Sequence, residues 1–308
     1  MRRRPVLLAL AALAAVAAVR GGPADDAPDS PYERALRKSV RRAQLELQRE
    51  LDLWEDHSSW DDPWIARSEH YEVRTTHSRG LARDLARGLD QMLGFFQSVL
   101  RRRYTPDAPF QVHVFPGLAE YNEFGTQHGA EHSSFYGSFF ASAAPGQPVA
   151  TYFVENRVLL RMWVTHGATH QFVAAAFGSE GPPWISEGLA AYFALYWDNA
   201  YGPAELERIS AQGGDIPLGE LLAAPEARYT DRPHERLVQL GMLFTYLLSF
   251  RDDTRLVYDG EELVSAPFAD YVVAVLRSQN VEANPVHELF TVDLEALELD
   301  FRGFEFPR

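Results

Sequence analysis

The chain has 308 residues, no cysteine and a formal net charge of −14. Without cysteine it cannot form disulfides or use a thiolate as nucleophile or metal ligand, so any metal ion must be held by His, Asp or Glu. The acidic balance argues against binding to nucleic acid and to anionic membranes. The length permits one large domain or two smaller ones.

The N-terminal stretch MRRRPVLLALAALAAVAAV predicts a secretory signal peptide over residues 1–18. Three arginines precede an apolar run over residues 6–19, with cleavage expected after Ala17 or Ala18. The run is shorter than the roughly 20 residues that span a bilayer, so an uncleaved anchor is the less favoured alternative. We therefore expect an exported protein, periplasmic or extracellular, with no membrane span after cleavage.

The remaining chain is expected to begin with strands and to continue with helices. Residues 19–68 predict a linker, a charged helix over 31–55 and a connector. Strands are predicted over residues 69–76, 110–115 and 149–154, helices over 80–103 and 117–124, and a loop or irregular strand over 133–147. Further helices are predicted over 156–177, from 182 onward, and over 203–212, 233–251, 262–279 and 284–300. Strands followed by helices indicate an α+β fold.

Two pairs of histidines have the spacing with which a helix presents two imidazoles to one metal ion. His166 and His170 lie in WVTHGATHQF, in the middle of an apolar helical stretch. His128 and His132 lie in HGAEH, which fits an inverted form of the motif but has glycines around it and no helical periodicity. The first pair is therefore the favoured one, and the alternative is a pair of core histidines that hydrogen-bond to backbone or to acids.

An acidic residue in the next predicted helix completes a ligand set. Glu187 follows the second histidine by one helix end and one loop, and its neighbours are apolar. A carboxylate among apolar side chains is costly unless it is paired or bound to a metal. Two neutral imidazoles and one carboxylate are a common zinc set, which leaves the fourth coordination position open.

The stretches HGATHQF and PPWISEGLAAYF together resemble the gluzincin metallopeptidases. They are most similar to a bacterial peptidase MA-like family of unknown function, in which HExxHQ is followed by a PxWxxEGLAxYF helix. The resemblance covers residues 69–302 and implies a zincin-like domain, with a small N-terminal sheet followed by a mostly helical half. It also implies zinc as cofactor, a peptide or unfolded protein segment as partner, and His166, His170 and Glu187 as metal ligands.

The sequence departs from the family pattern at the position of the general base. Gly167 stands where the family has the glutamate that takes a proton from the metal-bound water. A glycine in a helix interior suggests the close approach of another group, and Trp163 is the expected occupant of the vacated space. Gln171, one turn further on, cannot act as a base.

Two further departures concern residues around the metal. Ala191 stands where some gluzincins have a carboxylate that orients a ligand histidine, so a weakened zinc affinity is expected. Leu237 and Val238 lie near the position of the family's later Tyr or His, for which Tyr229 and His234 are nearby substitutes. We therefore expect a degenerate site that binds zinc and a peptide with little or no hydrolysis.

Two alternatives to this expectation stay open. The protein is an active zinc-dependent peptidase if another residue serves as the base, and Glu131 or Glu155 are the candidates. It is a structural relic without metal if the histidines are only hydrogen-bonded. Zinc content separates the relic from the other two, and hydrolysis that a chelator abolishes separates the active enzyme from the degenerate one.

Overall fold

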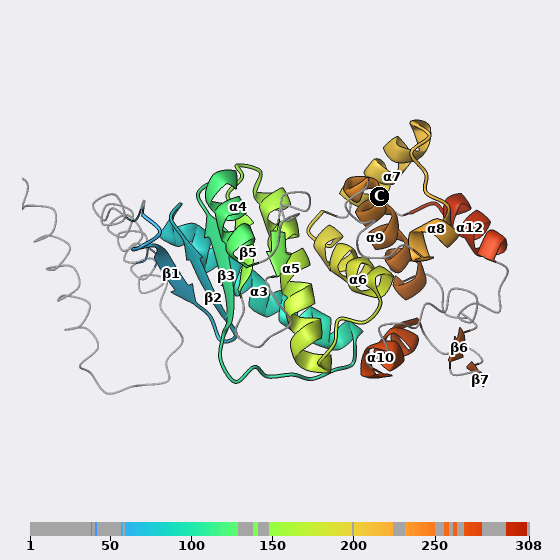
Figure 1. Cartoon of the computed structure of the whole chain (residues 1–308), viewed down its shortest axis with the longest axis horizontal. Helices are drawn as coiled ribbons and strands as arrows, with labels where there is room; N and C mark the ends of the chain where they lie inside the picture. Colours follow the sequence, from blue (N-terminus) through green and yellow to red (C-terminus); the bar gives the residue numbers. More distant parts are fainter. Residues whose placement is uncertain are drawn as a thin grey trace, which may run out of the picture. The chain divides into compact units, whose positions relative to one another are not determined.

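The computed structural model describes residues 38, 41, 57, 59–128, 138–140, 148–198, 200–223, 232–249, 256–258, 261–263, 268–278 and 294–306 (Figure 1). The chain divides into two compact units, Met1–Ser59 and Trp60–Arg308. The expected signal peptide, and the charged helix over 31–55 apart from positions 38 and 41, lie outside the described residues.

The second unit begins with a mixed five-stranded sheet. Its strands are β1 (Trp64–Arg67), β2 (Tyr71–Thr75), β3 (Phe110–Phe115), β4 (Ser138–Phe140) and β5 (Val149–Tyr152). They lie in the order β1-β2-β3-β5-β4, in which the three central strands are parallel and the two edge strands are antiparallel to their neighbours. The sequence predicted the central strands, missed β1, and left β4 inside a loop or irregular strand.

Helices make up most of the remaining fold. They are α3 (Arg79–Val99), α4 (Leu118–Gln127), α5 (Arg157–Phe177), α6 (Pro183–Leu195), α7 (Tyr201–Ala211), α8 (Leu218–Ala223), α9 (Pro233–Ser249), α10 (Phe268–Ser278) and α12 (Leu294–Gly303), with a short hairpin of β6 (Leu256–Tyr258) and β7 (Glu261–Leu263). The expected α+β class, a small sheet followed by a mostly helical half, is confirmed. The short helix α8 and the hairpin were not predicted.

The two faces of the sheet are covered by different helices. Apolar side chains of the central strands, such as Val73, Val112 and Val149, join the main core with the buried faces of α3 and α5. On the other face a smaller cluster forms around Phe115 and Tyr121, with α4 packed against β3 and β5. Helix α6 then packs on α5, and α9 packs on α6, so that α5 lies between the sheet and the helical half.

Local signals in the sequence fix where α5 begins and ends. The Asn156 side chain accepts hydrogen bonds from the backbone N–H groups of Val158 and Leu159, both at 3.1 Å, and so caps the first turn. Gly178 follows the last turn with φ 76°, the left-handed conformation that commonly ends a helix. Helix α6 begins at Pro183, a residue suited to a first helical turn.

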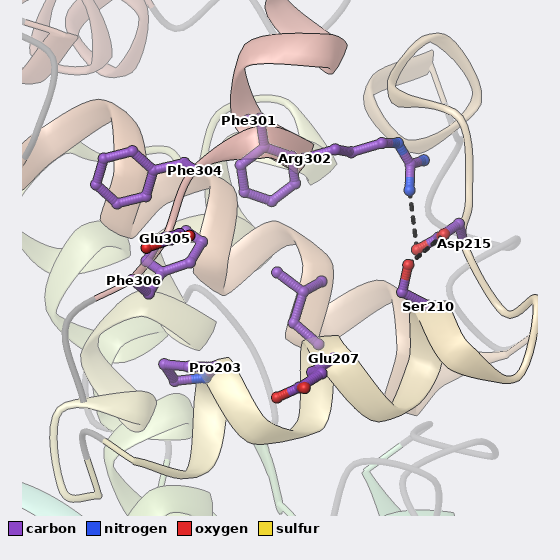
Figure 2. Close-up of a pocket in the computed structure, with 10 residues that line it drawn as sticks. Pro203, Glu207, Ser210, Asp215, Phe301, Arg302, Phe304, Glu305 and Phe306 are labelled. Atoms are coloured by element: carbon purple, nitrogen blue, oxygen red, sulfur yellow. Dashed lines mark hydrogen bonds and ion pairs between the residues drawn. The ribbon is translucent and has the colours of Figure 1, made fainter.

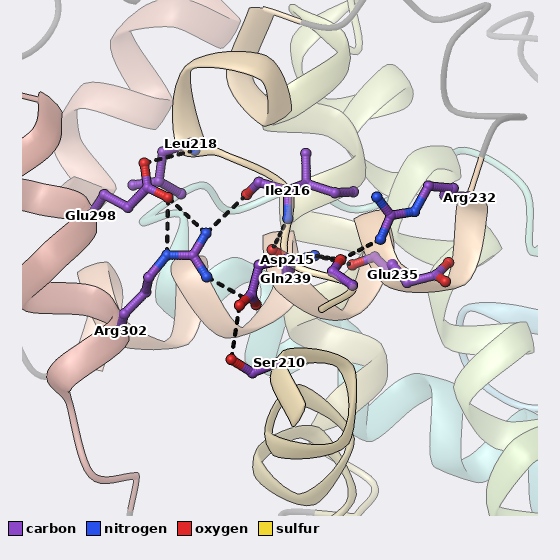
Figure 3. Close-up of polar contacts among 10 residues, drawn as sticks. Ser210, Asp215, Ile216, Leu218, Arg232, Glu235, Gln239, Glu298 and Arg302 are labelled. Carbon is purple, nitrogen blue, oxygen red and sulfur yellow. Dashed lines mark hydrogen bonds and ion pairs between the residues drawn. The ribbon is translucent and has the colours of Figure 1, made fainter. Parts of the chain in front are cut away.

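A polar network on α12 holds the segment between α7 and α8 (Figure 3). The guanidinium of Arg302 forms ion pairs with Asp215 at 2.9 Å and with Glu298 at 2.6 Å. It also donates to the backbone carbonyl of Ile216, whose N–H donates to the buried side chain of Gln239 on α9. The network therefore ties the segment to both α9 and α12.

A histidine whose two ring nitrogens are buried lies on the second face of the sheet. His113 on β3 is enclosed by aromatic rings, with ring centroids 5.4 Å from Trp60 and 5.7 Å from Phe124. Neither ring nitrogen has a hydrogen-bond partner among the described residues. Burial, and after it the charge of Arg74, lowers the pKa of His113 to about 4, although Glu72 partly opposes the shift.

This burial predicts a pH-dependent stability. Between about pH 6.5 and 4 the unfolded chain binds a proton at His113 that the folded chain does not, so stability is present above this range and lost as the pH falls through it. Replacing His113 by Phe should reduce the loss by about 2–3 kcal/mol at pH 4. The measurement is the free energy of unfolding in urea for both proteins at pH 7 and pH 4. Parallel pH profiles would contradict the prediction.

Candidate metal centre

Three side chains from α5 and α6 converge on one point. His166 and His170 stand one helical turn apart on α5, and Glu187 faces them from the first turns of α6. The two Nε2 atoms are 3.3 Å apart. Glu187 Oε2 lies 3.4 Å from His166 Nε2, and Oε1 lies 3.7 Å from His170 Nε2. The group can hold a metal ion.

The separations agree with the geometry of a small tetrahedral ion. Bonds of about 2.0–2.1 Å to a tetrahedral ion place two ligand atoms about 3.3–3.4 Å apart. Two of the three measured separations match this length, and the third is slightly longer. The fold therefore places two nitrogens and a carboxylate at separations that suit one tetrahedral ion.

The side chains of the site are largely shielded from solvent, and the pKa shifts of His166 and Glu187 favour the protonation states that bind a metal ion. The side chains of His166, His170 and Glu187 are 10%, 11% and 20% exposed. Burial lowers the pKa of His166, although Glu187 partly opposes this. Burial alone would raise the pKa of Glu187, but His170 and His166 hold it below its usual value. A neutral imidazole and an ionised carboxylate are the forms that bind metal ions.

One oxygen of Glu187 has no hydrogen bond within the part of the chain that the structure describes. This buried atom, Oε2, is the one that lies 3.4 Å from His166 Nε2. A buried carboxylate oxygen without a hydrogen bond is costly. A cation between the three side chains would remove this cost, because it would accept electron density from the oxygen and both nitrogens.

Two further side chains contact His170 on the side away from this centre. Its Nδ1 lies 2.9 Å from Glu180 Oε2 and 2.9 Å from Ser186 Oγ. The sequence analysis did not identify either residue. Glu180 lies in the connection between α5 and α6, where neither periodicity nor motif marked it.

The sheet closes the space beside Gly167, the position at which the sequence resemblance expects a general base. A side chain at Gly167 would place its Cβ 2.5 Å from Cγ1 of Val149, the first residue of β5. Val149 is fully buried and its branched side chain is stiff, so it cannot easily move aside. Trp163 was the expected occupant of this space, but its ring packs against Tyr152, with centroids 5.0 Å apart. Gln171 is buried and donates to the carbonyl of Gln111.

A small cavity adjoins His166. It has a volume of about 130 Å³ and is lined by residues of α5, α6, α7 and α9, which are Leu159, Met162, Trp163, His166, Ala191, Ala194, Leu195, Tyr201, His234, Leu237 and Val238. Two of these residues, Tyr201 on α7 and His234 on α9, are polar and lie on helices other than the one that carries His166. His234 Nε2 lies 2.6 Å from Glu205 Oε1. Burial, and after it the charge of Glu205, raises the pKa of Tyr201, so its hydroxyl remains a proton donor.

The structure thus brings His234 to the same cavity as His166, and adds Tyr201, which the sequence analysis missed. Tyr201 is the first residue of α7, a helix that no motif connected with the metal ligands. Tyr229, the other substitute considered, lies outside the described residues. Leu237 and Val238 contribute apolar wall.

Of the alternative bases and the alternative histidine pair, the structure describes Glu155 and His128, and neither belongs to the group that can hold a metal ion. Glu155 is exposed and precedes α5, whose first residue, Arg157, already lies about 13–14 Å from His166 along the helix axis. His128 is exposed, and its Nδ1 donates to the carbonyl of Phe124 at 2.8 Å. Glu131 and His132 lie outside the described residues.

A larger cavity lies elsewhere and contains none of these residues (Figure 2). Its volume is about 650 Å³, and it lies between α7 and the C-terminal segment 301–306. Phe301, Phe304 and Phe306 line one side, and Arg302 and Asp215 pair at its end. It offers no cluster of metal ligands within the described chain, so the convergence of donor atoms, rather than cavity size, identifies the site.

No protein-family model matches the chain, and no curated protein is significantly similar to it. The search for membrane-spanning helices, which covered the described residues, found none that is long and apolar enough to cross a bilayer.

The geometry predicts one divalent ion for each chain. Replacing His170 by Ala removes one of three donors and should abolish binding, whereas replacing the exposed His128 by Ala should leave it unchanged. Occupancy should fall as the pH is lowered, because protons compete for the imidazole nitrogens. The measurement is elemental analysis and titration with zinc after purification without metal. If only the His128 variant lost metal binding, the choice of His166 and His170 as the metal-binding pair would be wrong.

Proposed function

We propose that this protein is a zinc-binding, gluzincin-like peptidase homologue that binds a peptide segment and hydrolyses it little or not at all. The observation that carries the proposal is the contrast between two neighbouring positions on α5. His166 and its partners have the spacing of a metal site, whereas position 167 has no base and no room for one. The site is thus equipped for binding and not for proton transfer.

The donor set supports zinc over other ions. Two imidazole nitrogens and one carboxylate are typical zinc ligands, and magnesium and calcium prefer oxygen ligands alone. When bound, zinc would polarise a carbonyl oxygen and acidify a water molecule. Hydrolysis also needs a group that takes the proton of that water, and the glutamate that does so in the related enzymes is absent at Gly167.

Residues of the adjoining cavity support peptide binding. The wall is mostly apolar and suits a single apolar side chain, whereas Tyr201 and His234 supply polar groups at its edge. The Tyr201 hydroxyl can donate a hydrogen bond to a peptide carbonyl, because its raised pKa keeps it protonated. These groups would hold a peptide beside the metal without any need for chemistry.

The two alternatives, an active peptidase and a metal-free relic, place different requirements on the residues of the site. An active peptidase needs a base near the metal, and the separation of Glu155 from His166 argues against that candidate. A metal-free relic would hold His166, His170 and Glu187 only by their contacts with one another, at 3.3–3.7 Å, and the zinc content of the purified protein distinguishes it from a metal centre.

Hydrolysis is tested by restoring the base together with the space for it. Gly167→Glu alone should destabilise the protein by about 1–3 kcal/mol, because its Cβ would overlap Val149. Shortening Val149 to Ala leaves only its Cβ, 3.5 Å away, which is an ordinary contact. The double variant Val149→Ala/Gly167→Glu should therefore fold and gain zinc-dependent cleavage of an unfolded casein substrate, which the natural protein should lack.

The matched control is Val149→Ala alone, which has the same space and no carboxylate. It should bind zinc and remain inactive. Cleavage by the natural protein that a chelator abolishes would overturn the proposal and favour a base elsewhere in the chain. Inactivity of a folded, zinc-loaded double variant would mean that position 167 is not the only obstacle to hydrolysis.

We also propose that the protein is exported, on the strength of the basic start and the short apolar run over residues 6–19. Expression of the full chain in a bacterium should give a mature form that begins near residue 18 or 19 and is recovered outside the cytoplasm. N-terminal sequencing of that form is the measurement. Recovery of the chain with Met1 intact in the membrane fraction would contradict export by cleavage.

A further inference from the structure

The connection between α5 and α6 brings a fourth ionisable side chain to the edge of the metal centre. Glu180 is not one of the three ligands, and its Oε2 approaches His170 from the opposite side of the imidazole ring. The side chain of Ser186, the residue before Glu187, donates to the same carboxylate oxygen at 3.3 Å and lies 2.9 Å from His170 Nδ1. The three groups form a closed hydrogen-bonded set.

This arrangement determines which nitrogen of His170 carries the proton. A carboxylate can only accept a hydrogen bond, so the Nδ1 atom that faces Glu180 at 2.9 Å must be the donor. In a neutral imidazole the other nitrogen then carries the lone pair that can accept a hydrogen bond or bind a metal ion. That nitrogen, Nε2, is the atom that lies 3.3 Å from His166 Nε2 and 3.7 Å from Glu187 Oε1.

The backbone of the connection holds Glu180 in place. Gly178 and Gly181 flank it with φ of 76° and 74°, conformations that other residues adopt only with strain. The N–H of Gly181 donates to the side chain of Ser179 at 3.1 Å, which tightens the turn. The carboxylate is about one-third exposed, so it is positioned by this turn and not by burial.

We propose that Glu180 is a positioning residue of the metal centre, which fixes His170 in the Nδ1–H form and directs its Nε2 lone pair at the ion. The proposal rests on the proposed function, because it concerns the same metal. Glu180 takes the part of the carboxylate that is absent at Ala191, from another segment of the chain. It follows that the absence at Ala191 does not weaken the zinc affinity as the sequence suggested.

Removing a carboxylate of this kind typically lowers metal affinity 10–100-fold. Glu180→Ala should therefore weaken zinc binding by about 10–100-fold. Glu180→Gln keeps an acceptor oxygen without the charge and should show a smaller loss, of about tenfold or less. Glu123→Gln, at an exposed position of α4, removes the same charge far from the connection and should bind zinc as the natural protein does. The zinc dissociation constant is measured by competition with a chromophoric chelator.

A second measurement reads the imidazole directly and needs no metal. In the metal-free protein at pH 8, nitrogen NMR of labelled histidine should show His170 protonated at Nδ1. Glu180→Ala should shift the population towards the Nε2–H form, a change that a purely structural role of Glu180 would not produce. Circular dichroism confirms that each variant is folded.

The two measurements separate the proposal from the function on which it rests. If the natural protein binds no zinc while His170 still depends on Glu180 for its tautomer, the proposed zinc function fails and the positioning role stands. If Glu180→Ala leaves both the tautomer and the zinc affinity unchanged, the positioning role is overturned. Loss of the tautomer preference together with weaker zinc binding supports both.

Discussion

The candidate metal centre depends on a carboxylate that lies between two imidazoles. Glu187 lies at the interface of α5 and α6, where its side chain is 20% exposed and its neighbours in sequence are apolar. Removing an ionised carboxylate from water costs several kcal/mol unless opposite charge or hydrogen bonds compensate. The two imidazoles of α5 hold the pKa of this carboxyl below its usual value, so they keep it ionised rather than neutral. A cation between the three groups is the simplest arrangement that satisfies all of them, and it would link the two helices directly.

The same helix carries a second constraint on a neighbouring face, about 100° round its axis from His166. Gly167, one residue after His166, faces the sheet, and Val149 of β5 fills the space that a side chain would need. The glycine is therefore part of how α5 packs on the sheet, because a larger residue would push apart two elements of the main core. The close contact of helix and sheet at Gly167 explains why changing position 167 alone is expected to damage the fold.

Sequence patterns predicted the elements that carry strong local signals. The central strands β2, β3 and β5 showed apolar side chains in alternation or in a run, and α5 and α6 were bounded by Asn156, Gly178 and Pro183. The strand β1 was missed because it has four residues and exposes Ile65 while burying Ala66, which weakens the alternation that marks a half-buried strand. The three-residue β4 carries too little pattern to be distinguished from a loop.

For the candidate site, the predictable part was the part encoded within single helices and their motifs. His166 and His170 share a helix face by spacing alone, and Glu187 was found because a carboxylate stood among apolar residues in a recognisable phrase. The contact of Gly167 with Val149 depends on how α5 lies across the sheet, and no local rule gives it. The approach of Tyr201 and His234 to the cavity likewise depends on the packing of α7 and α9 around α6.

Glu180 shows most clearly why residues that contact a metal ligand, and not the metal itself, are not predicted from sequence. Its place beside His170 depends on two left-handed glycines that turn the chain between α5 and α6. The candidate metal ligands and the residues that contact His170 on its other side all lie between positions 166 and 187, on two adjacent helices and their connection. The side chain that closes the space at Gly167 comes from β5, and α7 and α9 supply part of the wall of the adjoining cavity. The hairpin of α5 and α6 can therefore hold the three donor atoms together by itself, while the sheet, α7 and α9 determine which groups fit beside them.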